Sequence, residues 1–299
     1  MQHLITTADF SNDEIIKLFD DTNLFLDLQT NSVLAGKLIV TLFFENSTRT
    51  RSSFEIAAKR LGASVVNLEV QTSSTKKGET VEDTVANLNA MKPDAIIIRH
   101  SESGLPASLI NQVSCPILNA GDGKNAHPTQ ALLDLFTIYT HYNGNVNGKK
   151  LAMIGDIKNS RVASSNLELL PRFGIDLTLV APKQFKLPSK FKTTKSIEKV
   201  IDKLDIIMSL RVQHERHELN KKLSQKQILK NTKEYAKKYC ITKNIMQDKD
   251  ILLLHPGPVN RNIDISDEML EDKRCKVLEQ VANGVAIRMA VLKKLILKQ

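Results

Sequence analysis

The sequence predicts an α/β protein of two domains, each a parallel sheet flanked by helices. At 299 residues the chain is long enough for two domains. Short apolar runs typical of buried strands alternate with helical patterns along both halves, which favours parallel sheets covered by helices. The cluster Asn143–Gly148 is the clearest interruption of this alternation. We therefore predict domains over residues 1–142 and 143–279, followed by a helix over 280–299.

The first domain opens with Ser11-Asn12-Asp13-Glu14, a capping box that predicts a helix running to about Leu28. Apolar runs then predict four strands, at Leu38–Phe44, Ser64–Val70, Ala95–Arg99 and Pro116–Asn119. Helical patterns fall after these strands, at Ser52–Leu61, Val81–Met91, Pro106–Val113 and Pro128–His141.

The second domain repeats the alternation. Strands are predicted at Leu151–Asp156, Asp176–Val180, Asp205–Ser209 and Ile251–Leu254. Helices are predicted at Ser160–Arg172, at Ser196–Lys203 and within Glu218–Lys238. The last helix, from about Val281 to Leu297, is apolar enough to dock on another element.

Composition narrows the class of protein. The net charge of +9 suits either nucleic-acid binding or the attraction of small anionic substrates. Much of the excess is lysine spread between Lys183 and Lys243 with few aromatic residues, so we expect no nucleic-acid partner. No apolar stretch could span a membrane, and no signal peptide is evident. The three scattered cysteines predict reduced thiols, no zinc site and a cytoplasmic location.

Polar clusters follow six of the predicted strands. Because ligands of parallel α/β sheets bind beyond the carboxyl ends of the strands, these clusters predict an active site in the cleft between the domains. The clusters are Glu45–Arg51, Arg99-His100, Gly121–Gln130, Asp156–Arg161, Ser209–Glu215 and His255–Arg261.

The first cluster predicts an anion site. Ser47, Thr48, Arg49 and Thr50 lie between a strand and a helix, where free backbone N–H groups and the helix dipole favour a phosphate. A simple N-cap is the alternative interpretation, but a cap needs one hydroxyl. Arginines in a first turn also oppose the helix dipole, which favours a functional role.

Further candidate ligands stand at the other junctions of the first domain. His127 precedes a helix that begins with Pro128, and a neutral imidazole there could donate a hydrogen bond to a carbonyl. Arg99 ends a strand and could reach over the sheet edge towards an anion, although a surface arginine is equally compatible with the pattern. Gly121–Ala126 matches a dinucleotide fingerprint only loosely and lacks its strand–helix context.

The second domain supplies arginines and rigid carbonyls. Arg161 opens a helix, while Arg211 and Gln213 share one face of an extended segment and could grip a carboxylate together. His255-Pro256-Gly257-Pro258 follows a strand, and its prolines cannot donate, so its carbonyls could accept from a substrate NH2 group. The loop around Lys77 is compatible with a lid that carries a cation or with a mobile surface loop.

These motifs, taken in order, resemble the aspartate/ornithine carbamoyltransferase family, and the likeness covers essentially the whole chain. It rests on the motifs 47–51, 77–79, 99–100, 127–130, 155–161, 211–213 and 255–258. The resemblance implies transfer of the carbamoyl group of carbamoyl phosphate to the amine of L-aspartate, with N-carbamoyl-L-aspartate and phosphate as products, in pyrimidine biosynthesis. It implies no covalent intermediate, no metal and no cofactor.

The resemblance also implies residue roles. The phosphate ligands would be Ser47, Thr48, Arg49, Thr50 and Arg99, with Arg49, Thr50, Arg99 and His127 as the catalytic set. The carbamoyl NH2 group would contact Gln130 and the carbonyls of Pro256 and Gly257. L-Aspartate would bind Lys77, Arg161, Arg211 and Gln213.

The same resemblance implies an assembly. Ser73 and Lys77 would reach the site of a neighbouring subunit, which makes a homotrimer the expected state. The last helix would pack back on the first domain. Regulatory chains in a larger assembly are left open.

Three rival functions are compatible with parts of the sequence. Ornithine or another amino acid could accept the carbamoyl group, but Arg211 and Gln213 suit an acid better than a side-chain cation. A basic nucleic-acid-binding protein is the second, and its binding should weaken steeply with salt. A catalytically idle scaffold is the third, and the complete set of polar ligands argues against it.

Overall fold

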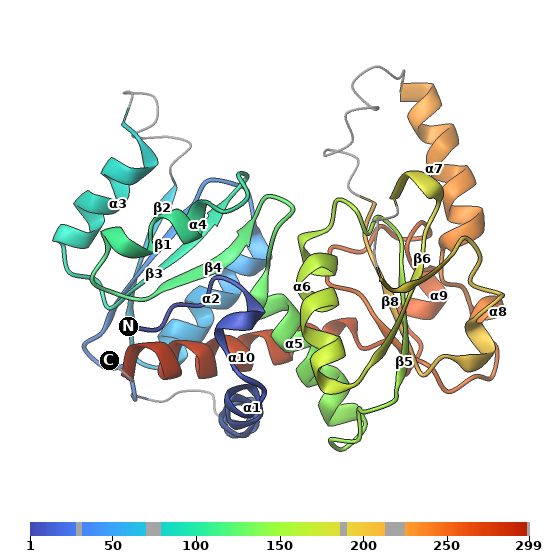
Figure 1. Cartoon of the computed structure of the whole chain (residues 1–299), viewed down its shortest axis with the longest axis horizontal. Coiled ribbons are helices and arrows are strands. Elements are labelled where there is room, and N and C mark those ends of the chain that lie inside the picture. The colour runs from blue at the N-terminus through green and yellow to red at the C-terminus, as the bar shows by residue number, and fades with distance from the viewer. Residues whose placement is uncertain (28–31, 70–78, 186–189, 213–224, 298–299) are drawn as a thin grey trace. The chain divides into compact units, whose positions relative to one another are not determined.

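Two parallel sheets organise the chain, and each lies in its own compact unit (Figure 1). The structure is a computed structural model that describes residues 1–27, 32–69, 79–185, 190–212 and 225–297. Unit 1 comprises Met1–Phe136 and Val281–Gln299, and unit 2 comprises Thr137–Gln280. The predicted fold class, two parallel sheets flanked by helices, is confirmed. The predicted boundary between residues 142 and 143 stays a prediction.

The sheet of unit 1 has four strands in the order β2-β1-β3-β4. They are β1 (Leu38–Phe43), β2 (Ser64–Glu69), β3 (Ala95–His100) and β4 (Ile117–Asp122), and all pairings are parallel. The central strand β3 is fully buried from Ala95 to Ile98, as its unbroken apolar run predicts. The N-terminal segment extends the sheet, because Leu4 forms a parallel bridge with Leu118 of β4.

Helices cover both faces of this sheet. α3 (Val81–Ala90) and α4 (Leu105–Ser108) pack on the face that presents Val40, Leu42 and Ile96. α2 (Thr48–Arg60) lies on the opposite face, because the β1-α2-β2 and β2-α3-β3 crossovers run in opposite directions along the sheet (Figure 1). The predicted helix over 106–113 is instead α4 followed by a short 3-10 turn, Ile110–Gln112.

The C-terminal helix α10 (Val277–Leu297) contacts other helices of unit 1. Its Lys293 forms an ion pair with Asp21, and its Lys294 forms one with Glu14, both on α1 (Asn12–Leu26). The remaining helical elements of unit 1 are η1 (Thr7–Asp9) and the first part of α5 (Pro128–His141).

The sheet of unit 2 has five parallel strands in the order β7-β6-β5-β8-β9. They are β5 (Lys150–Ile154), β6 (Asp176–Val180), β7 (Lys192–Thr194), β8 (Ile206–Ser209) and β9 (Leu252–Leu254). The strand β7 was not predicted, because it is a short polar edge strand without an apolar run. The predicted helix over 196–203 was wrong apart from a 3-10 turn, Ile201–Lys203.

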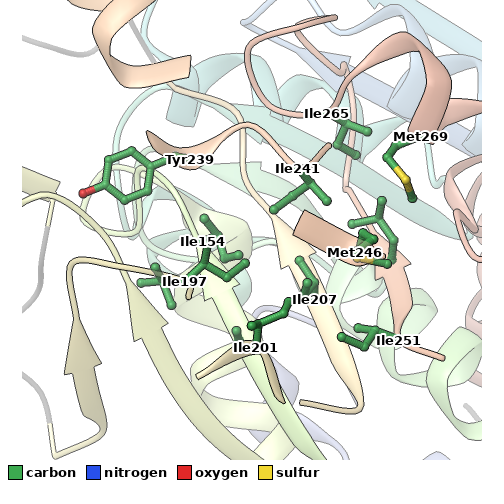
Figure 2. Packing of buried hydrophobic residues seen from close by; sticks show 13 residues of the cluster. Ile154, Ile197, Ile201, Ile207, Tyr239, Ile241, Met246, Ile251, Ile265 and Met269 are labelled. Atoms are coloured by element: carbon green, nitrogen blue, oxygen red, sulfur yellow. The ribbon is translucent and has the colours of Figure 1, made fainter. Parts of the chain in front are cut away.

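The core of unit 2 explains that error. Ile197 and Ile201 are buried in one cluster with residues of β5 and β8, so their spacing reflects burial and not a helix (Figure 2). Helical elements of this unit are α6 (Arg161–Leu169), η5 (Leu170–Phe173), η6 (Lys183–Phe185), α7 (Gln225–Tyr239), α8 (Lys243–Met246) and α9 (Asp267–Leu270).

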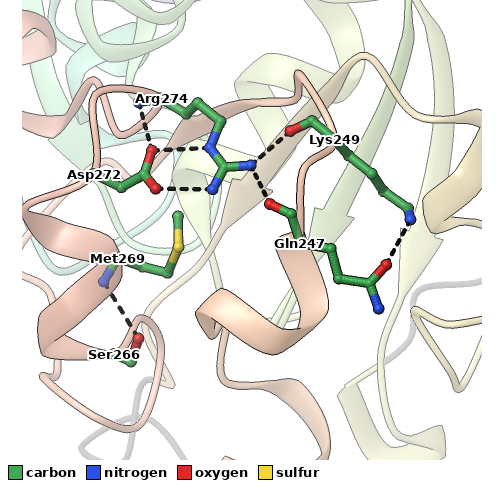
Figure 3. A network of polar contacts seen from close by, with 6 residues as sticks. All are labelled: Gln247, Lys249, Ser266, Met269, Asp272 and Arg274. Atoms are coloured by element: carbon green, nitrogen blue, oxygen red, sulfur yellow. Dashed lines mark hydrogen bonds and ion pairs between the residues drawn. The ribbon is translucent and has the colours of Figure 1, made fainter.

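A polar clamp holds the segment beside β9 (Figure 3). The Arg274 guanidinium forms a two-pronged pair with the Asp272 carboxylate at 2.8 Å. Its Nη1 also donates to the carbonyls of Gln247 (2.8 Å) and Lys249 (2.6 Å). Because the Leu253 amide donates to the Arg274 carbonyl at 2.9 Å, the clamp anchors the strand that leads into His255. Its role is therefore structural.

In the part of the chain that the structure describes, no helix has both the length and the apolarity needed to cross a membrane.

Candidate active site

The first turn of α2 is free of the usual capping interactions. The helix begins at Thr48, earlier than the predicted Ser52, so Thr48–Arg51 form its first turn. Among the described residues, the N-cap Ser47 hydroxyl makes no capping hydrogen bond, and the first turn contains no acid. The simple N-cap interpretation was therefore wrong. Hydroxyls and the exposed Arg49 instead surround the positive end of a helix, which suits an anion.

The caps of two other helices in unit 1 make the contrast clear. The Ser11 hydroxyl accepts from the Glu14 amide at the start of α1, and the Thr80 hydroxyl accepts from the Asp83 amide at the start of α3. Both helices also carry acids in their first turns. The first turn of α2 therefore differs from those of α1 and α3, which have both a side-chain cap and acids.

Arg99 lies beside this turn. Parallel register places Phe43 of β1 opposite Arg99 of β3, and the Phe44 amide donates to the Arg99 carbonyl at 2.9 Å. The guanidinium lies 3.3 Å from the Glu45 carboxylate and donates to the Ala120 carbonyl at 3.2 Å. The Arg99 side chain is only 13% exposed. It is therefore held between the carboxyl ends of β1 and β4.

Asp122 shapes the loop that carries His127. The loop joins β4 to α5, and the Asp122 carboxylate is completely buried. Its Oδ1 accepts from Asn119 Nδ2 (2.7 Å) and the Ala126 amide (3.0 Å). Its Oδ2 accepts from Asn125 Nδ2 (2.9 Å) and the Gly104 amide (2.7 Å). These four bonds fix the backbone immediately before His127.

The same loop explains the weak dinucleotide match. Gly123 has a φ of +45°, and a Cβ there would lie 2.3 Å from the Ser103 hydroxyl oxygen. The glycine is thus required by the turn and by close packing, without any nucleotide. His127 is 5% exposed, and its carbonyl accepts from the Gln130 and Ala131 amides in the first turn of α5.

Gln130 is oriented by a buried network. Its side-chain NH2 donates to Asp134 Oδ1 at 2.9 Å, which leaves Oε1 as the acceptor end of the amide. The buried Arg288 guanidinium of α10 donates to the Ser53 hydroxyl of α2 at 2.9 Å. Burial lowers the pKa of Arg288 to about 10, and the charge of Asp134 opposes that shift. The arginine therefore stays protonated at neutral pH.

Unit 2 gathers its candidate residues at the ends of β5, β8 and β9, which are adjacent strands. Arg161 is 4% exposed and is the first residue of α6, whose N-cap Ser160 accepts from the Ala163 amide. Arg211 follows β8 and is half-buried. Gly155 has a φ of +122°, and a Cβ there would lie 2.6 Å from the Leu210 carbonyl oxygen. This glycine lets the loops of Arg161 and Arg211 approach each other.

The loop after β9 presents the remaining candidates. Pro256 and Gly257 are half-buried and follow His255, which is 1% exposed. The Gly257 amide donates to His255 Nδ1 at 2.8 Å, and His255 Nε2 lies 3.2 Å from Asp264 Oδ2. The loop is therefore held by side chains and not by a strand or a helix.

The structure divides the predicted residues between the two units. Ser47–Thr50, Arg99, His127 and Gln130 belong to unit 1, whereas Arg161, Arg211, Pro256 and Gly257 belong to unit 2. Ser73, Lys77 and Gln213 lie outside the described residues.

Sequence reasoning missed several residues that hold the candidates in place. They are Glu45, Asp122, Asp134, Tyr235, Asp264 and Arg288. A signal existed for Asp134, which stands one helical turn after Gln130. Tyr235 lies close to Gly155, since a Cβ there would be 3.0 Å from its hydroxyl. Burial raises the pKa of Tyr235 well above its usual value, so its hydroxyl stays protonated.

Comparisons with known proteins identify the family of this chain. Residues 2–140 match the family model for the carbamoyl-P binding domain of aspartate/ornithine carbamoyltransferase, and residues 147–295 match the model for its Asp/Orn binding domain. The chain therefore belongs to the aspartate/ornithine carbamoyltransferase family, and the predicted resemblance is confirmed.

Two similar relatives in this family are both named aspartate carbamoyltransferase catalytic subunit. The chain is 65% identical to the aspartate carbamoyltransferase catalytic subunit of Aliarcobacter butzleri, covering 99% of both chains. It is 61% identical to that of Campylobacter lari, covering 100% of both.

Solved structures show the same likeness. The catalytic subunit of M. jannaschii aspartate transcarbamoylase has a TM-score of 0.88 at 32% identity, with 100% of this chain and 99% of that chain covered. Aspartate transcarbamoylase from Trypanosoma cruzi, in complex with carbamoyl phosphate and aspartate, also gives 0.88 at 32% identity, with 98% of this chain and 96% of that chain covered.

Proposed function

We propose that this chain transfers the carbamoyl group of carbamoyl phosphate to the amine of L-aspartate, giving N-carbamoyl-L-aspartate and phosphate. The observation that carries the proposal is the first turn of α2, an uncapped helix end with hydroxyls and an exposed arginine. It occurs in a chain that is 65% identical, over nearly its full length, to a protein named aspartate carbamoyltransferase catalytic subunit.

The phosphate of carbamoyl phosphate binds at this helix end. Ser47, Thr48, Arg49 and Thr50 supply hydroxyls, a cation and backbone N–H groups, and Arg99 adds a second guanidinium. Because Glu45 and the Ala120 carbonyl hold Arg99, little conformational freedom is lost when it binds the anion.

The carbamoyl group is held and polarised by neighbouring donors and acceptors. Thr50, Arg99 and His127 donate to its carbonyl oxygen, where negative charge develops during attack. Gln130 Oε1 and the carbonyls of Pro256 and Gly257 accept from its NH2 group. Asp134 supports this assignment, because it fixes the Gln130 amide with its oxygen free to accept.

L-Aspartate is recognised through its carboxylates. Arg161 and Arg211, with Gln213 and Lys77, bind the two carboxylates through forked, charge-assisted hydrogen bonds. The uncharged amine attacks the carbamoyl carbon, the C–O bond to phosphate breaks, and the departing phosphate takes the amine proton. The reaction needs neither a metal nor a covalent intermediate on the enzyme.

Aspartate is a better acceptor than ornithine for this site. Ornithine carries a side-chain cation, which needs a carboxylate partner, whereas the charged candidate residues of unit 2, Arg161 and Arg211, are themselves cations. The relatives described above also carry the name aspartate carbamoyltransferase.

The assembly and location form part of the proposal. Ser73 and Lys77 would act in the site of a neighbouring subunit, within a homotrimer in the cytoplasm, and the product would enter pyrimidine biosynthesis. Mixed oligomers of Lys77→Ala and Arg49→Ala chains should regain activity, because some sites would then contain neither change. No recovery in verified mixed oligomers would argue for sites built from one chain.

The direct test is Arg49→Ala in a carbamoylation assay. The change should lower kcat/KM by roughly a hundredfold or more, because it removes a charged phosphate ligand. Arg60→Ala, near the other end of α2, is the matched control and should behave as wild type. Wild-type protein should use aspartate and not ornithine. Near-normal turnover by the Arg49 variant, or a preference for ornithine, would overturn the assignment.

A further inference from the structure

The loop that presents the Pro256 and Gly257 carbonyls has no regular secondary structure to fix it. Pro256 and Pro258 cannot donate hydrogen bonds, so the backbone of the loop has few anchors of its own. The Gly257 amide is the donor between them, and its partner is the ring nitrogen Nδ1 of His255 at 2.8 Å. This N–H belongs to the Pro256–Gly257 peptide, so the direction of the Pro256 carbonyl depends on the orientation of one imidazole.

The hydrogen bonds assign the tautomer of His255. Since the Gly257 amide donates to Nδ1, that nitrogen must carry a lone pair. The ring proton then sits on Nε2, which lies 3.2 Å from the Asp264 carboxylate and donates to it. Both side chains are completely buried. The imidazole is thus an acceptor at one end and a donor at the other.

Asp264 is itself anchored to the rest of unit 2. Its Oδ2 also accepts from the Asn260 amide at 2.9 Å. Its backbone carbonyl accepts from the Ile241 amide (3.0 Å) and the Ser209 hydroxyl at the end of β8 (3.2 Å). The His255 backbone is held separately, because its amide donates to Gln280 Oε1 at 2.9 Å. A continuous chain of contacts therefore runs from β8 through Asp264 and His255 to the Gly257 amide.

We propose that His255 is a positioning residue that determines selection of the carbamoyl NH2 group, by fixing the Pro256–Gly257 peptide and its carbonyl while Asp264 fixes the imidazole. This inference rests on the proposed function, which uses the Pro256 and Gly257 carbonyls as acceptors. Acyl phosphates with a methyl group in place of NH2 do not use these carbonyls. Loss of the His255 contact should therefore weaken the binding of carbamoyl phosphate more than the binding of an acyl phosphate with a methyl group.

Two amide substitutions separate the two ends of the ring. His255→Asn places its oxygen near the position of Nδ1 and keeps an acceptor for Gly257. His255→Gln reaches towards Asp264 and leaves the Gly257 amide without its partner. Both variants are neutral and polar, so a general loss of packing should affect them alike. His141→Leu, at an exposed histidine, is the control for histidine replacement.

The measurement is the dissociation constant of carbamoyl phosphate against that of acetyl phosphate, by calorimetry, together with KM and kcat. His255→Gln should raise the dissociation constant of carbamoyl phosphate by about tenfold and leave that of acetyl phosphate within about twofold of the wild-type value. His255→Asn should bind carbamoyl phosphate nearly as tightly as the wild type, because it keeps an acceptor for the Gly257 amide. Asp264→Ala should reproduce the selective loss, because it frees the ring, and it serves if His255→Gln does not fold.

The outcomes are distinguishable. A wild-type protein that forms no N-carbamoyl-L-aspartate overturns the proposed function itself. An active wild type whose His255→Gln and His255→Asn variants behave alike overturns only the positioning role. Equal weakening of both acyl phosphates, in His255→Gln or in Asp264→Ala, does the same, since a purely structural defect would not distinguish the two ligands.

Discussion

Asp122→Asn tests whether a buried carboxylate organises the loop before His127. The carboxylate accepts four hydrogen bonds, two at each oxygen, and is completely buried. An asparagine has one oxygen and one NH2 group, so two of the four donors must face another donor. The loss in free energy of unfolding depends on which carboxylate oxygen the NH2 group replaces.

Replacement at Oδ1 is the less favourable choice. The NH2 group would face Asn119 Nδ2 and the Ala126 amide. Asn119 cannot turn its amide over without loss, because Nδ2 donates to the Ile5 carbonyl at 2.9 Å and Oδ1 accepts from the Gly121 amide at 2.8 Å. Turning the Asn119 amide over would therefore break both of these hydrogen bonds.

Replacement at Oδ2 is therefore expected. The NH2 group would face Asn125 Nδ2 and the Gly104 amide. Asn125 is exposed and can turn its amide to present an oxygen, but the Gly104 amide has no such freedom. One hydrogen bond to a charged acceptor is lost, which predicts a destabilisation of about 1.5–3 kcal/mol.

The assay is urea unfolding of the variant and the wild type, with Asp9→Asn as the control. Asp9 accepts from both the Ile5 and Thr6 amides through the same oxygen, Oδ2. Asparagine can keep both bonds there, so the control should lose less than about 0.5 kcal/mol. An Asp122→Asn protein as stable as the wild type, or a control that loses as much, would refute the reasoning.

Three further predictions concern other parts of the chain. Arg99→Lys should raise KM for carbamoyl phosphate by roughly tenfold or more, since an ammonium cannot replace the forked contacts; an unchanged KM would contradict the assigned role. Hydrogen bonding to Lys294 lowers the pKa of Glu14 to about 2, so the pair stabilises the fold above pH 4.5 and loses this effect as pH falls towards 2. Glu14→Gln should therefore cost about 1–3 kcal/mol at neutral pH, measured by urea unfolding, and the difference from wild type should shrink on acidification. Burial raises the pKa of Cys115 and Cys240 to about 11, so both thiols should react slowly with a disulfide reagent at about pH 8 and rapidly in urea; fast reaction of either of these two thiols in the folded protein would contradict its burial.

Long apolar runs allowed the sheets to be predicted. Ala95–Ile98 and Leu151–Ile154 read as buried strands because a strand between two neighbours is apolar on both faces. The polar edge strand β7 has no such run and was missed. Ile197 and Ile201 have helical spacing, yet both are buried in the core of unit 2 without forming a helix. The spacing of apolar residues indicates which side chains are buried, and tertiary contacts determine the backbone conformation.

The candidate site divides in the same way. Residues that would contact substrate stand directly after strands, and their hydroxyls and guanidiniums carry a chemical meaning that the sequence alone expresses. The residues that support them cannot be recognised in this way from the sequence. Arg288 lies 235 positions from Ser53, and Asp264 acts on Gly257 only through an imidazole.

The sequence by itself determined the fold class, the family and the chemical kind of site, because short-range patterns of apolar, hydroxyl and basic residues encode them. Only the tertiary structure decided which buried carboxylates hold which loops. Asp122 and Asp264 carry no local pattern that distinguishes them from surface acids. Their roles arise because folding removes them from water and leaves backbone N–H groups, asparagine amides and an imidazole as their hydrogen-bond donors.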